Sequence, residues 1–344
     1  MYNALLAQAR ACASIGSTMY ERLFEDLAAD YADNGRTYAL LAGRSARPIH
    51  DAIPLRLAGA LHRIVLSGQD PRLARHYPSA GGSPGTDFTA DVIAYMRDHT
   101  DEIDLALTQQ VQTNEVGRSI VHLCVSHWLT SQSITDFDLL EIGASAGLNL
   151  NFDLYYACSQ RLRMGSPQSR VRFMGDSFGH TPALPNSAAR VHRRRGVDIS
   201  PLDVTRDEDR LRLLSFLWPD QKKRLERTRA AIDIALQRPP VVDEGSADSW
   251  LATQLARPFE RAVVVFHSIV WQYLGERVQE GVRQALRDAS SRATSAAPLL
   301  WVRMEPAGAV ADVQVDMWNG ESAEPRHQVL AEVGYHGSQM NWLT

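Results

Sequence analysis

The residues best suited to chemistry lie in one short segment, Asp138-Leu-Leu-Glu-Ile-Gly-Ala-Ser-Ala-Gly-Leu-Asn149. Its apolar start and small middle predict a strand, a tight turn and a helix that begins at Gly147. Small residues let a ligand approach the backbone closely, and a new helix offers free N–H groups and the positive end of its dipole. We therefore expect a ligand-binding turn made of Glu141, Gly143, Ala144, Ser145, Gly147 and Asn149.

Two functional motifs overlap in this turn. The cofactor turn of methyltransferases is an acidic residue followed by x-G-x-G-x-G; Glu141 fits it, as do Gly143 and Gly147, while Ser145 replaces the middle glycine. The motif G-x-S-x-G also matches residues 143–147 and would make Ser145 the nucleophile of a serine hydrolase, with His336 as a later histidine. A turn with a purely structural role is the third interpretation.

The elements around the turn divide the chain into a helical front and an alternating back. Residues 1 to about 130 have a helical period, seen in Leu57, Leu61 and Ile64, and contain no convincing strand. Beyond residue 136, strands are expected at 137–142, 170–174, 191–197, 241–242, 261–266 and 299–304, with a final pair from 313. Helices are expected at 207–217, 219–237 and 271–288. Such alternation predicts a parallel sheet wound on both sides.

The predicted fold class is α/β, with an N-terminal α-helical cap domain over 1–130 and a Rossmann-like, mostly parallel methyltransferase-type sheet over 131–344. A turn-rich insertion is expected at about 160–190. This order of elements favours the cofactor turn, because a hydrolase elbow lies in mid-sheet with several strands before it. The cofactor turn also accounts for the acid at Glu141, which a serine elbow does not require.

The chain resembles the bacterial proteins grouped as domain-of-unknown-function family 2332. The resemblance covers nearly the whole chain and is carried by PLRLAGALHRIVLSG (54–68), NEVGRS (114–119), LLEIGASAGLNL (139–150), RRGVDISPLD (194–203), WPDQ (218–221), VVVFHSIVWQYL (263–274), LWVRMEP (300–306) and HGSQMNW (336–342). The C-terminal half of that family is similar to class I S-adenosylmethionine-dependent methyltransferases. The resemblance therefore implies S-adenosylmethionine as cofactor and a small molecule as substrate.

A methyltransferase-like sheet gives expectations for two further strand ends. Its second strand ends in an acid that accepts hydrogen bonds from the ribose hydroxyls, and Asp198 is the candidate. The alternative is that Asp198 caps the turn before Pro201. After the third strand, similar proteins read Gly-Asp-Ala near the adenine, whereas this chain has Gly245 followed by Ser246 and Ala247. That departure weakens the expectation of tight adenine recognition.

Two polar groups complete the candidate site. His267 and Ser268 end the fourth strand, where the methyl group would be transferred, so His267 is a candidate general base as well as a candidate structural histidine. Asn114, Glu115 and Arg118 precede the first strand. They either cap a helix or bind a carboxylate, from the cofactor's methionine end or from an acidic substrate.

Composition narrows the function classes. The formal charge is −4, and the run Arg193-Arg194-Arg195 is interpreted as a solvated strand edge or turn, so no nucleic-acid partner is expected. Three widely spaced cysteines match neither a disulfide framework nor a zinc site, and no other metal site is expected. With no signal peptide and no apolar run of about 20 residues, a cytoplasmic protein without a membrane partner is expected.

The leading functional prediction is methyl transfer to a small molecule held between cap and sheet. The alternatives are a serine hydrolase that uses Ser145 and a non-catalytic binding protein that retains the methyltransferase fold. Neither the methyl acceptor nor the oligomeric state follows from the sequence.

Overall fold

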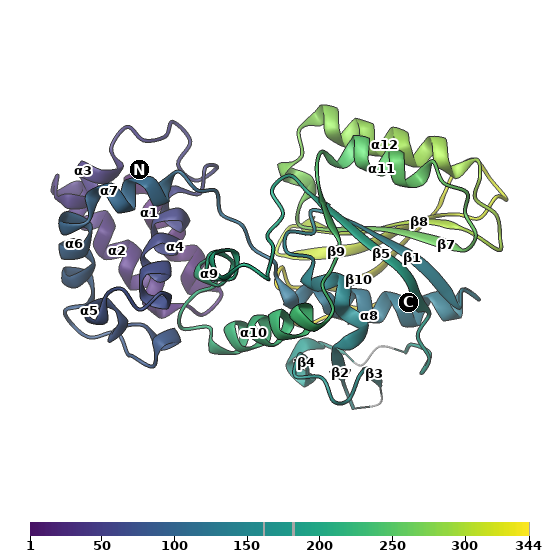
Figure 1. Cartoon of the computed structure of the whole chain (residues 1–344), viewed down its shortest axis with the longest axis horizontal. Helices are drawn as coiled ribbons and strands as arrows, with labels where there is room; N and C mark the ends of the chain where they lie inside the picture. Colours follow the sequence, from purple (N-terminus) through teal and green to yellow (C-terminus); the bar gives the residue numbers. More distant parts are fainter. Residues whose placement is uncertain (161, 181–182, 344) are drawn as a thin grey trace. The chain divides into compact units, whose positions relative to one another are not determined.

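The computed structural model describes residues 1–160, 162–180 and 183–343, which form two compact units (Figure 1). The first unit is Met1–Thr113 with Thr205–Glu226, and the second is Asn114–Val204 with Arg227–Thr344. This division differs from the predicted one at residue 130. Residues 114–130 pack with the sheet, and residues 205–226 return to the helical unit.

The first unit is all helical in its described residues. Its helices are α1 (Tyr2–Ser14), α2 (Thr18–Ala32), α3 (Arg36–Leu41), α4 (Ile53–Leu66), α5 (Pro71–Ala74), η1 (Pro78–Ala80), α6 (Phe88–Asp98), α7 (Thr100–Leu107) and α9 (Asp207–Ser215). Helix α4 buries Leu57, Leu61 and Ile64 in the core of this unit, as their helical spacing predicts.

Residues 205–226 belong to the helical unit because three contacts hold them there. Gly59 of α4 leaves room for the Phe216 ring, since a Cβ at Gly59 would lie 2.5 Å from it. Asp220 of the WPDQ segment accepts hydrogen bonds from the Ser17 hydroxyl at 2.8 Å and from the Met19 N–H, at the start of α2. Trp218 is buried in the same core.

The second unit is built on an eight-stranded sheet in the order β11-β10-β9-β8-β7-β1-β5-β6. Its strands are β1 (Asp136–Ile142), β5 (Arg190–Asp198), β6 (Val242–Glu244), β7 (Ala262–Ser268), β8 (Leu299–Ala307), β9 (Val310–Trp318), β10 (Arg326–Val333) and β11 (Asn341–Trp342). The five strands from β6 to β8 are parallel, and β9 to β11 add an antiparallel meander. The predicted α/β class with a mostly parallel sheet is confirmed.

Helices cover both faces of this sheet (Figure 1). Helix α8 (Ser119–Ser131) lies on one face, where its His122 contacts Phe266 of β7. Helices α11 (Ala247–Leu255) and α12 (Glu276–Ser290) lie on the other and bury Leu251 and Leu286 against Val265. Helix α10 (Lys222–Gln237) connects the two units along the chain.

Several local predictions were wrong in extent or type. The helix expected from Gly147 is the short 3-10 helix η3 (Leu148–Leu154). The insertion contains a small sheet of β2 (Tyr156–Cys158), β3 (Arg163–Gly165) and β4 (Arg172–Phe173), followed by η4 (Gly175–Ser177). The helix expected at 271–288 splits into η5 (Trp271–Tyr273) and α12, because Gly275 separates them, and α11 was not predicted.

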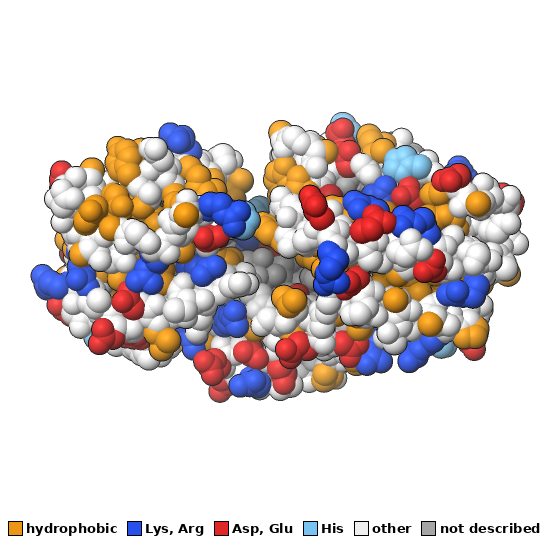
Figure 2. Space-filling view, turned by 90° about the horizontal axis from the view of Figure 1, so that it is seen from above, with side chains coloured by type: hydrophobic (Ala, Val, Ile, Leu, Met, Phe, Trp, Pro, Cys, Tyr) orange, Lys and Arg blue, Asp and Glu red, His pale blue; other side chains and the backbone are white. Residues whose placement is uncertain are grey.

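Two surface properties bear on partners. In the described part of the chain, no helix combines the length and apolar character required to cross a membrane. On the face shown in Figure 2, acidic and basic side chains are interspersed, and neither sign forms an extended patch. The expectation of no nucleic-acid partner stays a prediction.

Candidate ligand-binding site

The candidate site lies where the chain reverses its direction across the sheet. From β1 the chain moves outward to β5 and β6, and it then returns to the other side of β1 to form β7 and β8. In doubly wound sheets such a switch point opens a crevice outside the carboxyl ends of the strands, where ligands bind. Here the crevice position lies beyond Ile142 of β1 and Ser268 of β7.

The turn after β1 has an unusual backbone. Gly143 and Gly147 have φ values of +70° and +69°, and Ser145 has +53°. This left-handed region suits glycine, which explains why the methyltransferase turn has a glycine at the middle position that Ser145 occupies here. Ile269, just beyond β7, has a φ of +49°, which is rare for a β-branched residue. Backbone strain thus gathers on both sides of the switch point, as it does at many functional sites.

The N–H groups of the turn are directed into the protein. Those of Gly143 and Ala144 donate to the Val197 carbonyl at 2.9 and 3.1 Å, and that of Ser145 donates to Asp198 Oδ2 at 2.8 Å. Asp198 Oδ1 also accepts the Ser200 N–H at 3.0 Å. Asp198 therefore fixes the turn and has the capping role that was the alternative expectation for it. The arrangement does not form the cradle of free N–H groups that a phosphate needs.

Glu141 is buried at the end of β1, under the turn. Its Oε1 lies 4.0 Å from His122 Nε2, and its Oε2 has no hydrogen-bond partner among the described residues. Burial raises the pKa of Glu141 to about 8, although the charge of Arg118 and a hydrogen bond from Asn149 act in the opposite direction. Burial also lowers the pKa of His122 to about 3. At neutral pH both side chains are therefore mostly uncharged.

The segment before α8 ties several elements to this edge. It includes η2 (Val116–Arg118). Asn114 Oδ1 accepts the Leu148 N–H at 2.8 Å, so it caps η3, not its own helix. Arg118 donates to the Ser268 carbonyl at 3.2 Å and to the Tyr335 carbonyl at 3.0 Å. Arg118 thereby holds the end of β7 beside the loop that follows β10.

The motifs NEVGRS and HGSQMNW meet at this edge. Glu115 accepts the Gly117 N–H at 3.0 Å through Oε1, and its Oε2 lies 3.4 Å from His336 Nδ1. A Cβ at Gly117 would lie 2.0 Å from the His336 carbonyl oxygen, and one at Gly337 would lie 2.1 Å from the Gly117 carbonyl oxygen. The two loops therefore touch backbone to backbone.

His267 points toward the α11 and α12 face of the sheet and is fully buried. Its Nδ1 lies 2.7 Å from Glu305 Oε1, and its ring stacks on Trp271 with centroids 5.2 Å apart. Glu305 Oε1 also accepts the N–H groups of Val270 and Trp271 at 3.1 and 3.2 Å. Glu305 thus orients the imidazole and fixes the loop after β7, while His267 Nε2 has no hydrogen-bond partner among the described residues.

The remaining predicted residues lie close to the same edge. The Gly245 N–H donates to the Asp198 carbonyl at 3.0 Å, so Ser246 and Ala247 follow directly beside the end of β5. The Ser246 hydroxyl donates to Asp248 at the start of α11. Asn149 accepts from the Ser119 hydroxyl at 2.7 Å.

Among the described residues, no base lies within hydrogen-bond reach of Ser145, although the hydrolase interpretation requires one. Ser145 Oγ is buried and has no hydrogen-bond partner among the described residues, whereas a serine nucleophile needs a base within reach. His336, the histidine considered for that role, faces Glu115.

Comparison with known proteins identifies the family. The chain belongs to the family described as "Uncharacterized protein conserved in bacteria (DUF2332)", whose model matches residues 2–342, and the predicted membership is confirmed. A search of curated proteins found no match.

Two solved structures are similar at a low level. One, titled "DhpI-SAH complex structure", shares 10% identity over 83% of this chain and 80% of that chain, with a TM-score of 0.22. The other is an S-adenosylmethionine-dependent methyltransferase from Clostridium acetobutylicum ATCC 824, with 9% identity over 72% and 87% and a TM-score of 0.24. Similarities this low carry no inference about the ligand of this chain.

Proposed function

We propose that this protein binds S-adenosylmethionine at the carboxyl edge of β1, β5 and β7 and transfers a methyl group to a small molecule. The observation that carries the proposal is the strained turn at residues 143–147, which lies at the switch point between two acids, Glu141 and Asp198. When bound, the cofactor supplies an electrophilic methyl group on its sulfonium centre.

The residues at this edge fit a charged nucleoside without phosphate. Each Asp198 oxygen accepts one backbone N–H and retains acceptor capacity for the hydroxyls of a ribose. The N–H groups of Gly143, Ala144 and Ser145 are bonded within the protein, so the turn lacks the set of free donors that the pyrophosphate of a dinucleotide needs. Glu141 would gain its charge when a cation lies near it, because a nearby positive charge favours the ionised form.

The first test is the affinity of Asp198→Asn for S-adenosylhomocysteine, measured by calorimetry. We expect micromolar binding by the natural protein and about tenfold weaker binding by the variant, because hydroxyls lose a charged acceptor. Asp233→Asn removes the same charge from α10, where Asp233 pairs with Arg170 at the surface, and should bind normally. Equal affinity of all three proteins would remove Asp198 from the site.

We propose that His267 is the general base, with Glu305 as its positioning residue. Glu305 holds Nδ1, so Nε2 is the nitrogen left to accept a proton from the methyl acceptor. With methyl-labelled cofactor and a bacterial small-molecule extract, His267→Gln should transfer label at least about 100-fold more slowly than the natural protein. His327→Gln on β10 is the matched control, and binding of S-adenosylhomocysteine should be unchanged in both variants. Transfer by His267→Gln at the natural rate would exclude the base role.

A protein that binds the cofactor without transferring the methyl group is the second candidate. The observation that favours it is the burial of His267, which Trp271 and Trp301 enclose. This candidate expects binding of S-adenosylhomocysteine but no labelled product from any extract, and so the same experiment separates the two.

A further inference from the structure

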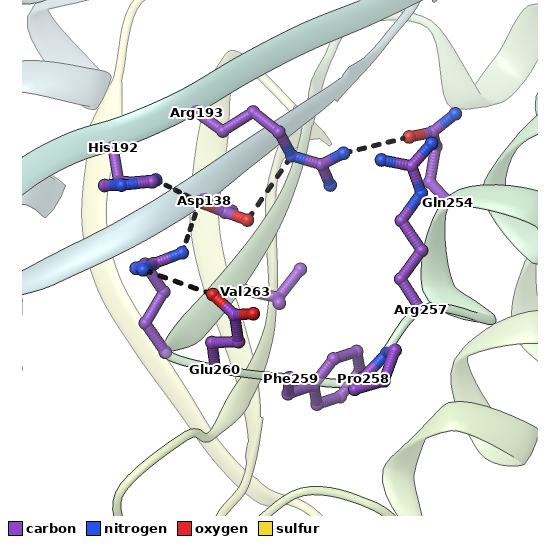
Figure 3. A pocket seen from close by; sticks show the side chains of 10 residues that line it. Asp138, His192, Arg193, Gln254, Arg257, Pro258, Phe259, Glu260 and Val263 are labelled. Atoms are coloured by element: carbon purple, nitrogen blue, oxygen red, sulfur yellow. Dashed lines mark hydrogen bonds and ion pairs between the residues drawn. The ribbon is translucent and has the colours of Figure 1, made fainter.

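A pocket opens at the edge of the sheet opposite the candidate site (Figure 3). It has a volume of about 520 Å³, within the range of small-molecule sites. Asp138, Arg193 and Val263 line it, each near the amino-terminal start of β1, β5 or β7. Because these strands are parallel, this edge is the one away from residues 143–147.

The lining of the pocket holds three guanidinium groups, of Arg193, Arg257 and Arg261, and two carboxylates, of Asp138 and Glu260. Asp138 is the one largely buried acid in its lining, and it lies within 3.6 Å of Arg193, Arg261 and His192. Glu260, the other acid of the lining, has 78% of its side chain exposed. Arg261 also donates to Asp136 Oδ1 at 3.0 Å and lies 3.5 Å from Glu260, so acids balance the charges of Arg193 and Arg261.

Arg257 adds a third guanidinium group. It follows the end of α11, and no described residue pairs with it. Figure 3 shows its side chain directed to Gln254 and toward the end of Arg193. Two guanidinium groups side by side without an acid between them repel each other, and an anion between them removes that repulsion.

Gln254 supplies a neutral amide at the same point. It is only 6% exposed, and its Oε1 accepts from Arg193 Nη1 at 3.5 Å. Its amide N–H groups are thereby turned away from Arg193 and have no hydrogen-bond partner among the described residues. The Gln254 N–H groups reach an anion between Arg193 and Arg257 only after the amide turns over, which exchanges the positions of its oxygen and nitrogen.

The rest of the lining is apolar. Phe259, Pro258 and Val263 form the wall below the guanidinium groups (Figure 3). Phe259 is partly buried and packs against the α11–α12 core. A ligand that fills this space has a charged head and an apolar, ring-sized body.

From these contacts we infer that the pocket binds an organic anion, with its carboxylate or phosphate head between Arg193, Arg257 and Gln254 and its apolar body against Phe259. The anion site is separate from the proposed cofactor site, and anion binding there does not depend on methyl transfer.

The test is calorimetric titration of the full chain with phenyl phosphate and with benzoate, in low salt. We expect one of the two to bind, and the one that binds more tightly identifies the head group. Benzyl alcohol, which has the ring without the charge, should bind at least about tenfold more weakly. Binding of benzyl alcohol as tight as that of the anions, or binding of none of the three compounds, would overturn the inference.

Variants locate the binding site. Arg257→Gln should weaken anion binding about tenfold without affecting folding, because Arg257 is exposed and has no described partner. Arg170→Gln is the matched control; its side chain is 78% exposed and pairs only with Asp233. Anion binding that is equal in both variants would place the anion elsewhere and overturn the assignment.

Discussion

Replacing Gly117 by alanine is expected to lower the free energy of unfolding of the second unit by about 3 kcal/mol. The added methyl group would lie 2.0 Å from the His336 carbonyl oxygen and 2.9 Å from Glu115 Oε1. A backbone oxygen cannot move aside without displacing its loop, so the clash separates residues 115–118 from the loop after β10. The cost is steric, because Gly117 does not have a positive φ.

The measurement is urea unfolding followed by tryptophan fluorescence. Of the seven tryptophans, only Trp218 belongs to the helical unit, so the signal reports mainly on the sheet unit. Gly175→Ala is the matched control, since a Cβ there meets no atom within 4 Å. Unfolding of Gly117→Ala at the same urea concentration as the control would contradict the close backbone contact between the two loops.

Replacing Glu141 by glutamine is expected to change how stability depends on pH. The folded chain raises the pKa of Glu141 from 4.5 to about 8, so between these values the folded state holds a proton that the unfolded state has released. Stability therefore falls as pH rises through this window, by a total on the order of 5 kcal/mol. Glutamine resembles the protonated acid and removes this loss.

The test compares unfolding of the natural protein and Glu141→Gln from pH 5 to pH 8.5. The variant should gain stability relative to the natural protein as pH rises, and Glu321→Gln, an exposed position, should not. Parallel stability curves for the natural protein and Glu141→Gln would show that Glu141 ionises normally in the folded chain.

The sheet was largely predictable from the sequence. The apolar run at β7 suits a strand covered on both faces, and the observed Ala262–Ser268 begins one residue from the expected start. The sequence predicted a helix after the turn but not its 3-10 form. That form depends on hydrogen bonds to distant parts of the chain: Asn149 donates to the carbonyl of Glu115, and Asn151 donates to the carbonyl of Arg238.

The candidate site was predictable where it depends on strand ends. Glu141, Asp198 and Ser268 meet because the carboxyl ends of parallel strands share one edge. Glu305 was not predicted, although strand alternation gives a signal for it. Arg303 lies opposite His267 in the register of β7 and β8, and Glu305, two residues later, lies on the same face of the sheet as Arg303. The contact of His122 with Glu141 had no such signal, because it depends on how α8 packs against the sheet.

The ion pairs of the basic run were not predicted, for a related reason. Residues 193–195 lie within β5 and pair with β1, whereas β6 pairs with residues 196–198. Arg194 pairs with Asp153 and Arg195 with Asp243, the latter at 2.6 Å. These partners come from distant parts of the chain, so the pairing, and with it the pocket beside Arg193, became visible only in the fold.

The most direct test of the proposed function is calorimetric titration of the natural protein with S-adenosylhomocysteine, adenosine and methionine. The proposal predicts micromolar binding of S-adenosylhomocysteine and weaker binding of adenosine, because the turn and Asp198 contact the nucleoside part. Absence of binding to S-adenosylhomocysteine at millimolar concentration would contradict it and remove the methyltransferase assignment.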